Sequence, residues 1–107
     1  YTPVLIGTKA EEEILQIIES SNPRIINLQG KTSFAQLASL ARTAKYAVGN
    51  DTGPMHLIAA AGCPCTVMFN TNESMPEKCA PRGDWVSIVQ SPKIEEITIA
   101  DILSTVL

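Results

Sequence analysis

Short apolar runs alternate with amphipathic stretches along the whole chain. The strand-like runs cover residues 3–7, 24–28, 45–48, 66–69 and 85–89. Apolar residues at helical spacing fall in the intervening segments 10–20, 34–41, 54–61 and 98–107. Strands that alternate with short helices pair in parallel through right-handed crossovers. The pattern therefore predicts a three-layer α/β domain with a mostly parallel sheet of about five strands.

Three segments have the form of a capping box, in which a hydroxyl residue is followed three positions later by an acid or amide. These segments are Thr8-x-x-Glu11, Ser33-x-x-Gln36 and Thr98-x-x-Asp101. Each satisfies two orphan N–H groups at a helix start, so the spacing predicts that helices begin there.

The segment from Gly49 to His56, Gly-Asn-Asp-Thr-Gly-Pro-Met-His, joins an apolar run to a helix of small residues. A strand–turn–helix junction of this kind presents unsatisfied N–H groups and the positive end of a helix dipole. Gly53 has no Cβ to keep a ligand away, and Pro54 suits an early helical position. The turn is therefore predicted to bind a phosphate or pyrophosphate.

A simpler interpretation of the same turn stays open. Asp51 or Thr52 can cap the helix with no ligand involved. His56, the single histidine, either packs and hydrogen-bonds within the protein or donates to a phosphate oxygen.

Composition narrows the choice of function. The chain has 107 residues, 45% of them hydrophobic and 18% charged, which suits one globular domain. A net charge of −3 without a basic cluster argues against a nucleic-acid partner. No apolar run is long enough for a membrane span. The chain has an odd number of cysteines, Cys63, Cys65 and Cys79, which indicates reduced thiols in the cytoplasm. The Cys-Pro-Cys spacing is shorter than that of usual zinc sites, so we expect no bound metal.

Residues 70–84 interrupt the alternation with two prolines, a glycine and five charged residues. A loop of this length in a compact domain is usually functional or disordered. It leaves the carboxyl end of the strand at 66–69, the side on which open α/β sheets bind ligands.

The segment from Asp51 to Leu57, with Ala-Ala-Ala-Gly at 59–62, resembles the signature of glycosyltransferase family nine, the heptosyltransferases and their relatives. Segments 4–7 with 11–13, 37–49 and 79–83 are similar to the same family. The resemblance implies one half of a GT-B enzyme, a Rossmann-like domain that binds the nucleotide-sugar donor. Residues 1–107 would then be a fragment without its acceptor domain, its first strand or a catalytic residue.

The same resemblance assigns roles to individual residues. Asp51, Thr52, Gly53 and His56 would lie at the diphosphate and sugar of the donor, and Glu11 would contact the ribose. Glu11 can instead reach back to the Thr8 N–H in a capping box, and both alternatives stay open. The implied donor is a nucleoside-diphosphate sugar such as ADP-heptose, with no separate cofactor. The implied acceptor is lipopolysaccharide or another glycan, and the enzyme would be cytoplasmic or peripheral at the inner membrane.

Two other functions stay open as well. One is a UDP-sugar enzyme of related architecture, such as a 2-epimerase. The other is a non-catalytic, flavodoxin-like interaction domain, in which the turn only starts a helix.

The family comparison also places the first strand of this domain before Tyr1. In the strand order 3-2-1-4-5-6, that strand would separate the strands at 3–7 and 45–48. We predict that these two strands pair directly instead, because unpaired edges expose backbone donors. The alternative is pairing between two copies of the chain.

Overall fold

The computed structural model describes residues 1–50, 52–70 and 85–106. They form two compact units, Tyr1–Ser33 and Phe34–Leu107, each with its own sheet. Each unit is described by itself.

The first unit is one β-α-β crossover. Its elements are β1 (Val4–Leu5), the 3₁₀ helix η1 (Lys9–Glu11), α1 (Glu12–Glu19) and β2 (Ile26–Asn27). β1 and β2 are parallel, with Val4 paired to Ile26. Leu15 of α1 is buried, and a Cβ placed on Gly7 would come within 2.7 Å of the Leu15 Cδ1 atom. The glycine therefore lets the helix pack closely on the end of β1.

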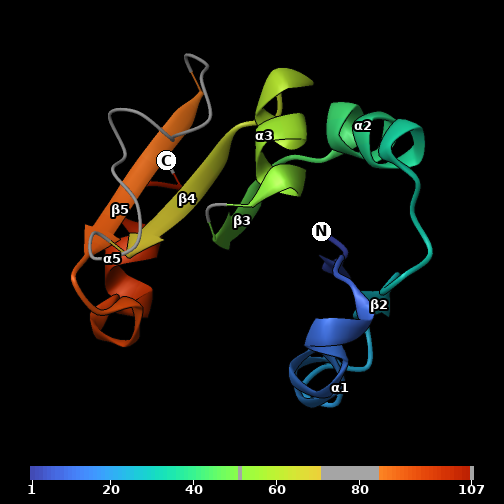
Figure 1. Ribbon diagram of the computed structural model, residues 1–107, viewed down its shortest axis with the longest axis horizontal. Coiled ribbons are helices and arrows are strands. Elements are labelled where there is room, and N and C mark those ends of the chain that lie inside the picture. Colours follow the sequence, from blue (N-terminus) through green and yellow to red (C-terminus); the bar gives the residue numbers. More distant parts are fainter. Residues whose placement is uncertain (51, 71–84, 107) are drawn as a thin grey trace. The chain divides into compact units, whose positions relative to one another are not determined.

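The second unit contains a three-stranded parallel sheet in the order β3-β4-β5. Its elements are α2 (Phe34–Thr43), β3 (Ala47–Asn50), α3 (Gly53–Ala60), β4 (Cys65–Asn70), β5 (Val86–Ser91), the 3₁₀ helix η2 (Ile94–Glu96) and α5 (Ile99–Leu103). α3 lies alongside β3 and β4 and packs against α2, whereas η2 packs against β4 and β5 (Figure 1).

Both faces of the central strand β4 are covered. Gly49 of β3 pairs with Val67 of β4, and that face carries α3, since Gly49 lies against Met55 of the helix. Thr66 points to the opposite face, where its hydroxyl hydrogen-bonds that of Thr105, just after α5. The sheet therefore lies between two helical layers, and the fully buried residues of β4 are Cys65, Thr66, Val67 and Phe69.

Most of the predicted elements are confirmed, with shifts of a few residues at their ends. The last helix is shorter than the predicted segment 98–107: α5 ends at Leu103. The capping boxes of Thr8 and Thr98 are both formed. The Ser33 box stays a prediction, and the loop at 71–84 lies outside the described residues.

The prediction that the strands at 3–7 and 45–48 pair directly is wrong. β1 hydrogen-bonds only to β2, and β3 only to β4, among the residues that the structure describes. The strand order is β1-β2 in the first unit and β3-β4-β5 in the second. The five parallel strands are therefore divided between two sheets. Pairing between two copies stays a prediction.

Candidate functional site

The predicted phosphate turn follows the carboxyl end of β3. Thr52 is the residue before α3 and has an extended backbone, with φ −142° and ψ 163°. Its side chain makes no capping hydrogen bond. Of the two capping residues that the sequence offered, Thr52 therefore does not cap the helix with its side chain, and capping by Asp51 stays a prediction. Asp51 lies outside the described residues.

Gly53 is the first residue of α3, and open space surrounds it. A Cβ built on Gly53 would meet no atom within 4 Å. Among the described glycines, only Gly30 and Gly62 have a positive φ. The backbone at Gly53 is therefore not left-handed and does not itself require a glycine. Neither close packing nor a left-handed backbone therefore requires a glycine at position 53.

Gly49, four residues earlier, has the opposite surroundings. A Cβ built on it would lie 2.7 Å from Sδ and 3.0 Å from Cγ of Met55, which is buried. The glycine thus allows the first turn of α3 to close onto the end of β3. The motif by itself does not indicate this role of Gly49. Its only signal is that Gly49 lies two positions after Ala47 and so shares its face of β3.

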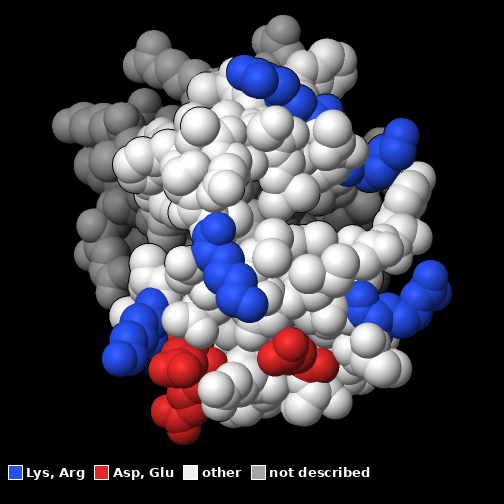
Figure 2. Space-filling view, turned by 90° about the vertical axis from the view of Figure 1, so that its right-hand side faces the viewer, with Lys and Arg blue, Asp and Glu red and all other residues white. Residues whose placement is uncertain are grey.

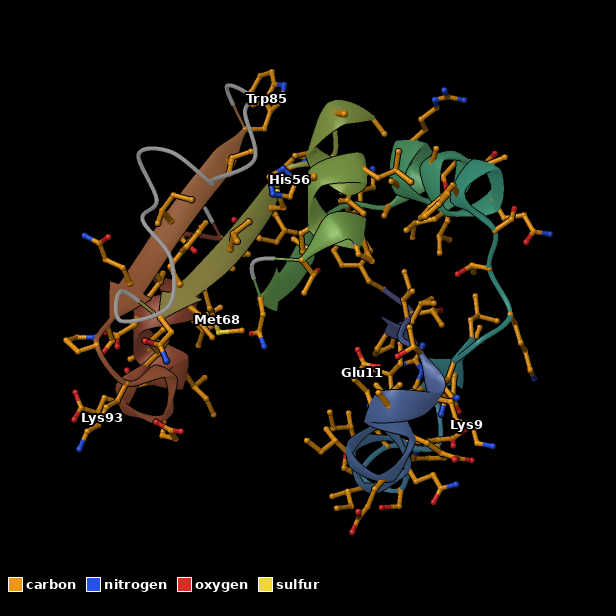
Figure 3. The ribbon with its side chains drawn as sticks, viewed as in Figure 1. Lys9, Glu11, His56, Met68, Trp85 and Lys93 are labelled. Atoms are coloured by element: carbon orange, nitrogen blue, oxygen red, sulfur yellow. The ribbon has the colours of Figure 1, made fainter. Side chains whose placement is uncertain are left out.

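His56 extends from the first turn of α3 (Figure 3). The residue is exposed, and its main-chain N–H donates to the Thr52 carbonyl at 3.2 Å. An exposed imidazole at the positive end of a helix can donate to an anion bound there.

Glu11 is held by the capping box at the start of η1. The Thr8 main-chain N–H donates to Glu11 Oε2 at 2.9 Å, and the Thr8 hydroxyl hydrogen-bonds the same oxygen. These bonds, the side-chain bond first, lower the pKa of Glu11 from its ordinary value of 4.5. The associated stability is therefore present above about pH 4.5 and is lost as the pH falls through the lowered pKa. The capping alternative for Glu11 is confirmed, and its ribose contact stays a prediction.

The described cysteines do not form a metal centre. Cys63 and Cys65 are buried free thiols, and burial raises the pKa of both, which disfavours the thiolate that binds metal. No group of three or more histidine, cysteine or acidic side chains within 1–50, 52–70 and 85–106 is arranged to hold a metal ion. Cys79 lies outside these residues.

A hollow of about 390 Å³ lies at the other end of the second unit's sheet. Lys45, Pro64 and Trp85, which line it, precede β3, β4 and β5, so the hollow opens at the amino ends of the strands. Its tyrosine is already engaged, because the Tyr46 hydroxyl bonds Thr66 Oγ1 at 2.7 Å and donates to the Thr105 carbonyl at 3.1 Å. The turn, at the carboxyl end, is the better candidate because parallel sheets bind ligands there.

The charged side chains of the described residues are coloured in Figure 2. Lysine and arginine side chains are spread over this face and do not gather into one basic patch. None of the helices that the structure describes is long and apolar enough to cross a membrane.

Comparison with known proteins identifies the family. The sequence model of glycosyltransferase family 9 (heptosyltransferase) matches residues 2–101. The chain belongs to this family. As a family 9 member, it carries the predicted signature on the β3–α3 junction and the fold that the signature implied.

Individual relatives agree with this assignment. The chain is 26% identical over 95 residues to lipooligosaccharide heptosyltransferase 2 of Haemophilus influenzae, a match over 84% of this chain and 27% of that protein. Among solved structures, it resembles the ADP-heptose LPS heptosyltransferase II of E. coli, with a TM-score of 0.85 and 24% identity. That match covers 98% of this chain and 35% of the other.

A second solved structure, the family 9 glycosyl transferase of Veillonella parvula, matches with a TM-score of 0.76 and 21% identity. It covers 97% of this chain and 30% of that one. The family 9 chain thus has the parallel α/β fold of one half of a heptosyltransferase. It spans about a quarter of the curated relative and about a third of each solved structure.

Proposed function

We propose that this chain is the donor-binding half of a glycosyltransferase that transfers a sugar, such as heptose from ADP-heptose, to a lipopolysaccharide-type or other glycan acceptor. The observation that carries the proposal is the open first turn of α3, where Thr52 does not cap and Gly53 leaves space. Family membership and the ADP-heptose named for the E. coli structure support the choice of donor.

The proposed chemistry explains why an anion site belongs at this turn. Sugar transfer breaks the anomeric C–O bond, and negative charge develops on the departing nucleoside diphosphate. Hydrogen-bond donors fixed around that phosphate stabilise the transition state more than the ground state. We assign this role to the Thr52 hydroxyl and N–H, the Gly53 N–H and the His56 imidazole.

We assign the two acidic residues to parts of the donor other than its phosphates. Asp51 would repel a phosphate at short range, so we assign it to orienting the turn or to holding sugar hydroxyls. Glu11, in the first unit, accepts hydrogen bonds from the ribose hydroxyls. The acceptor and the catalytic group belong to the other half of the enzyme. We place the enzyme in the cytoplasm, peripheral at the inner membrane in its full-length form.

The proposal is tested by titrating the 107-residue chain with ADP, UDP and GDP in a calorimeter. We expect weak binding of at least one diphosphate and no sugar transfer by this chain alone. Binding of a nucleotide would exclude the alternative function, a non-catalytic interaction domain. Failure to bind any of the three at millimolar concentration would overturn the proposal, as would turnover of a sugar nucleotide by the chain alone.

Product analysis separates the transferase from the epimerase alternative. The chain joined to the remainder of its enzyme, supplied with ADP-heptose or a UDP-sugar, should yield free nucleoside diphosphate and a glycosylated acceptor. Conversion of a UDP-sugar into its epimer would identify the other enzyme.

Replacement of His56 by alanine tests the imidazole separately. The substitution His56→Ala should weaken diphosphate binding by about 1–3 kcal/mol, the usual value of a hydrogen bond to a charged group. Because His56 is exposed, the thermal unfolding of the His56→Ala variant should differ little from that of the unmodified chain. Calorimetry of both proteins measures the difference, and unchanged affinity would remove His56 from the site.

A further inference from the structure

Residues 98–106 of the second unit have little apolar attachment to its sheet. Helix α5 buries none of its residues, and Ile99 and Leu103 are 76% and 61% exposed. Segments with few buried apolar contacts are the ones that open while the rest of a protein stays folded. Burial of apolar surface therefore contributes little to holding this segment against the sheet.

Thr105, just after α5, fastens the segment to the sheet by two hydrogen bonds. Its carbonyl accepts from the Tyr46 hydroxyl at 3.1 Å, and its hydroxyl bonds that of Thr66 at 2.5 Å. Tyr46 directly precedes β3, and Thr66 lies in β4 with no exposed surface. The segment is thus joined through Thr105 to two neighbouring strands.

Each side of this junction keeps a hydrogen bond of its own when the two separate. On the sheet, the hydroxyls of Tyr46 and Thr66 lie 2.7 Å apart, so that one donates to the other. In the segment, the Thr105 hydroxyl donates to the Ile102 carbonyl at 2.6 Å. Separation therefore leaves none of the three hydroxyls without a partner, and the cost of a buried unpaired group is avoided.

The junction also has one hydroxyl hydrogen too few. The hydroxyls of Tyr46, Thr66 and Thr105 make four contacts, counting the two to carbonyl oxygens, yet each hydroxyl carries a single hydrogen. At most three of the four contacts can therefore be hydrogen bonds at any moment. The junction is weaker than its four short distances suggest, which suits a contact that forms and breaks.

We propose that residues 98–106 form a strap, which opens and closes on the second unit's sheet as one piece, with the hydroxyls of Tyr46, Thr66 and Thr105 as its latch. Thr105 and Val106 also line the hollow of about 390 Å³ at the amino ends of the strands, so opening of the strap removes one wall of this hollow. The strap is independent of the proposed function, because it needs no nucleotide.

Hydrogen exchange of the folded 107-residue chain, followed by NMR, tests the strap directly. The Ile102 and Ser104 amides donate hydrogen bonds inside the strap, whereas the Cys65 amide of β4 donates to the Trp85 carbonyl. We expect both strap amides to be protected at least about 30-fold less than Cys65, and equally to within about 2-fold. Their exchange should depend weakly on urea, because a local opening exposes little surface.

Removal of the latch should favour the open strap. In the double variant Tyr46→Phe with Thr66→Val, apolar groups of nearly the same shape replace both sheet hydroxyls, and Thr105 loses both of its bonds to the sheet. We expect the protection of Ser104 to fall by about 3- to 30-fold, while that of Cys65 changes by less than about 3-fold. Tyr46→Phe alone removes the bond to the Thr105 carbonyl and should lower the protection of Ser104 by about 2- to 10-fold.

Thr43 offers a matched control in the same unit. Its hydroxyl donates to the Leu40 carbonyl at 3.0 Å, so Thr43→Val removes a hydroxyl that bonds within its own helix, α2. This control should leave the exchange of Ser104 and Cys65 as it is in the unmodified chain. Circular dichroism of each variant checks that the fold is kept.

The outcomes test the strap and its latch separately. Equal protection and equal urea dependence of Ser104 and Cys65 in the unmodified chain would overturn the strap, since the segment would then open only with the sheet. Protection that decreases steadily from Ile102 to Ser104 would also overturn it, because the helix would then fray from its end. Unchanged protection of Ser104 in the folded double variant or in Tyr46→Phe, or an equal loss in Thr43→Val, would overturn the latch.

Discussion

The substitution Gly53→Val should abolish nucleoside diphosphate binding while the protein keeps its fold. A Cβ at this position meets no protein atom within 4 Å, so the valine side chain enters open space. Under the proposed function, a phosphate comes close to the N–H groups of the first turn of α3 in this same space. Calorimetric titration with the diphosphate that the unmodified chain binds best should show no heat of binding at millimolar concentration.

A matched control lies on the same helix. Ala60 is exposed and is the last residue of α3, so Ala60→Val introduces the same branched side chain away from the first turn. It should bind the diphosphate as the unmodified chain does. The unfolding free energy of both variants should stay within about 1 kcal/mol of the original. Normal affinity in Gly53→Val would mean that the turn merely starts a helix.

Gly49→Val should have the reverse effect, a large loss of stability. The first added carbon alone would lie 2.7 Å from the Met55 Sδ atom, and Met55 is only 4% exposed, so it has little room to move. Overpacking of a core usually costs 1–3 kcal/mol and occasionally more, and valine adds three carbons here. We expect the free energy of unfolding to fall by about 3 kcal/mol, although valine favours strands.

Urea unfolding, followed by circular dichroism and by fluorescence of Trp85, measures this loss. Trp85 is the only tryptophan and belongs to the same unit as Gly49. In a Met55→Ala background, which removes the clashing atoms, Gly49→Val should cost much less. An equal cost in both backgrounds would show that the Met55 contact is not the cause.

The local elements of this protein could be predicted from its sequence, because their signals lie within a few residues of one another. Helical spacing of apolar residues located α1 and α2, and short apolar runs located the strands. The capping box of Thr8 and Glu11 spans three positions and is formed as predicted. The β3–α3 junction was located in the same way, from a glycine-bearing turn between an apolar run and a small-residue helix.

The tertiary structure decided what each of those residues does. Gly49 and Gly53 belong to one motif, yet one lies against Met55 and the other faces open space. Tyr46 and Thr105 hydrogen-bond across 59 positions, a pairing that no local pattern indicates. The division of the five strands into two sheets likewise depends on hydrogen bonds between distant segments. Periodicity and capping report interactions along one element, whereas packing and strand pairing depend on which elements meet in space.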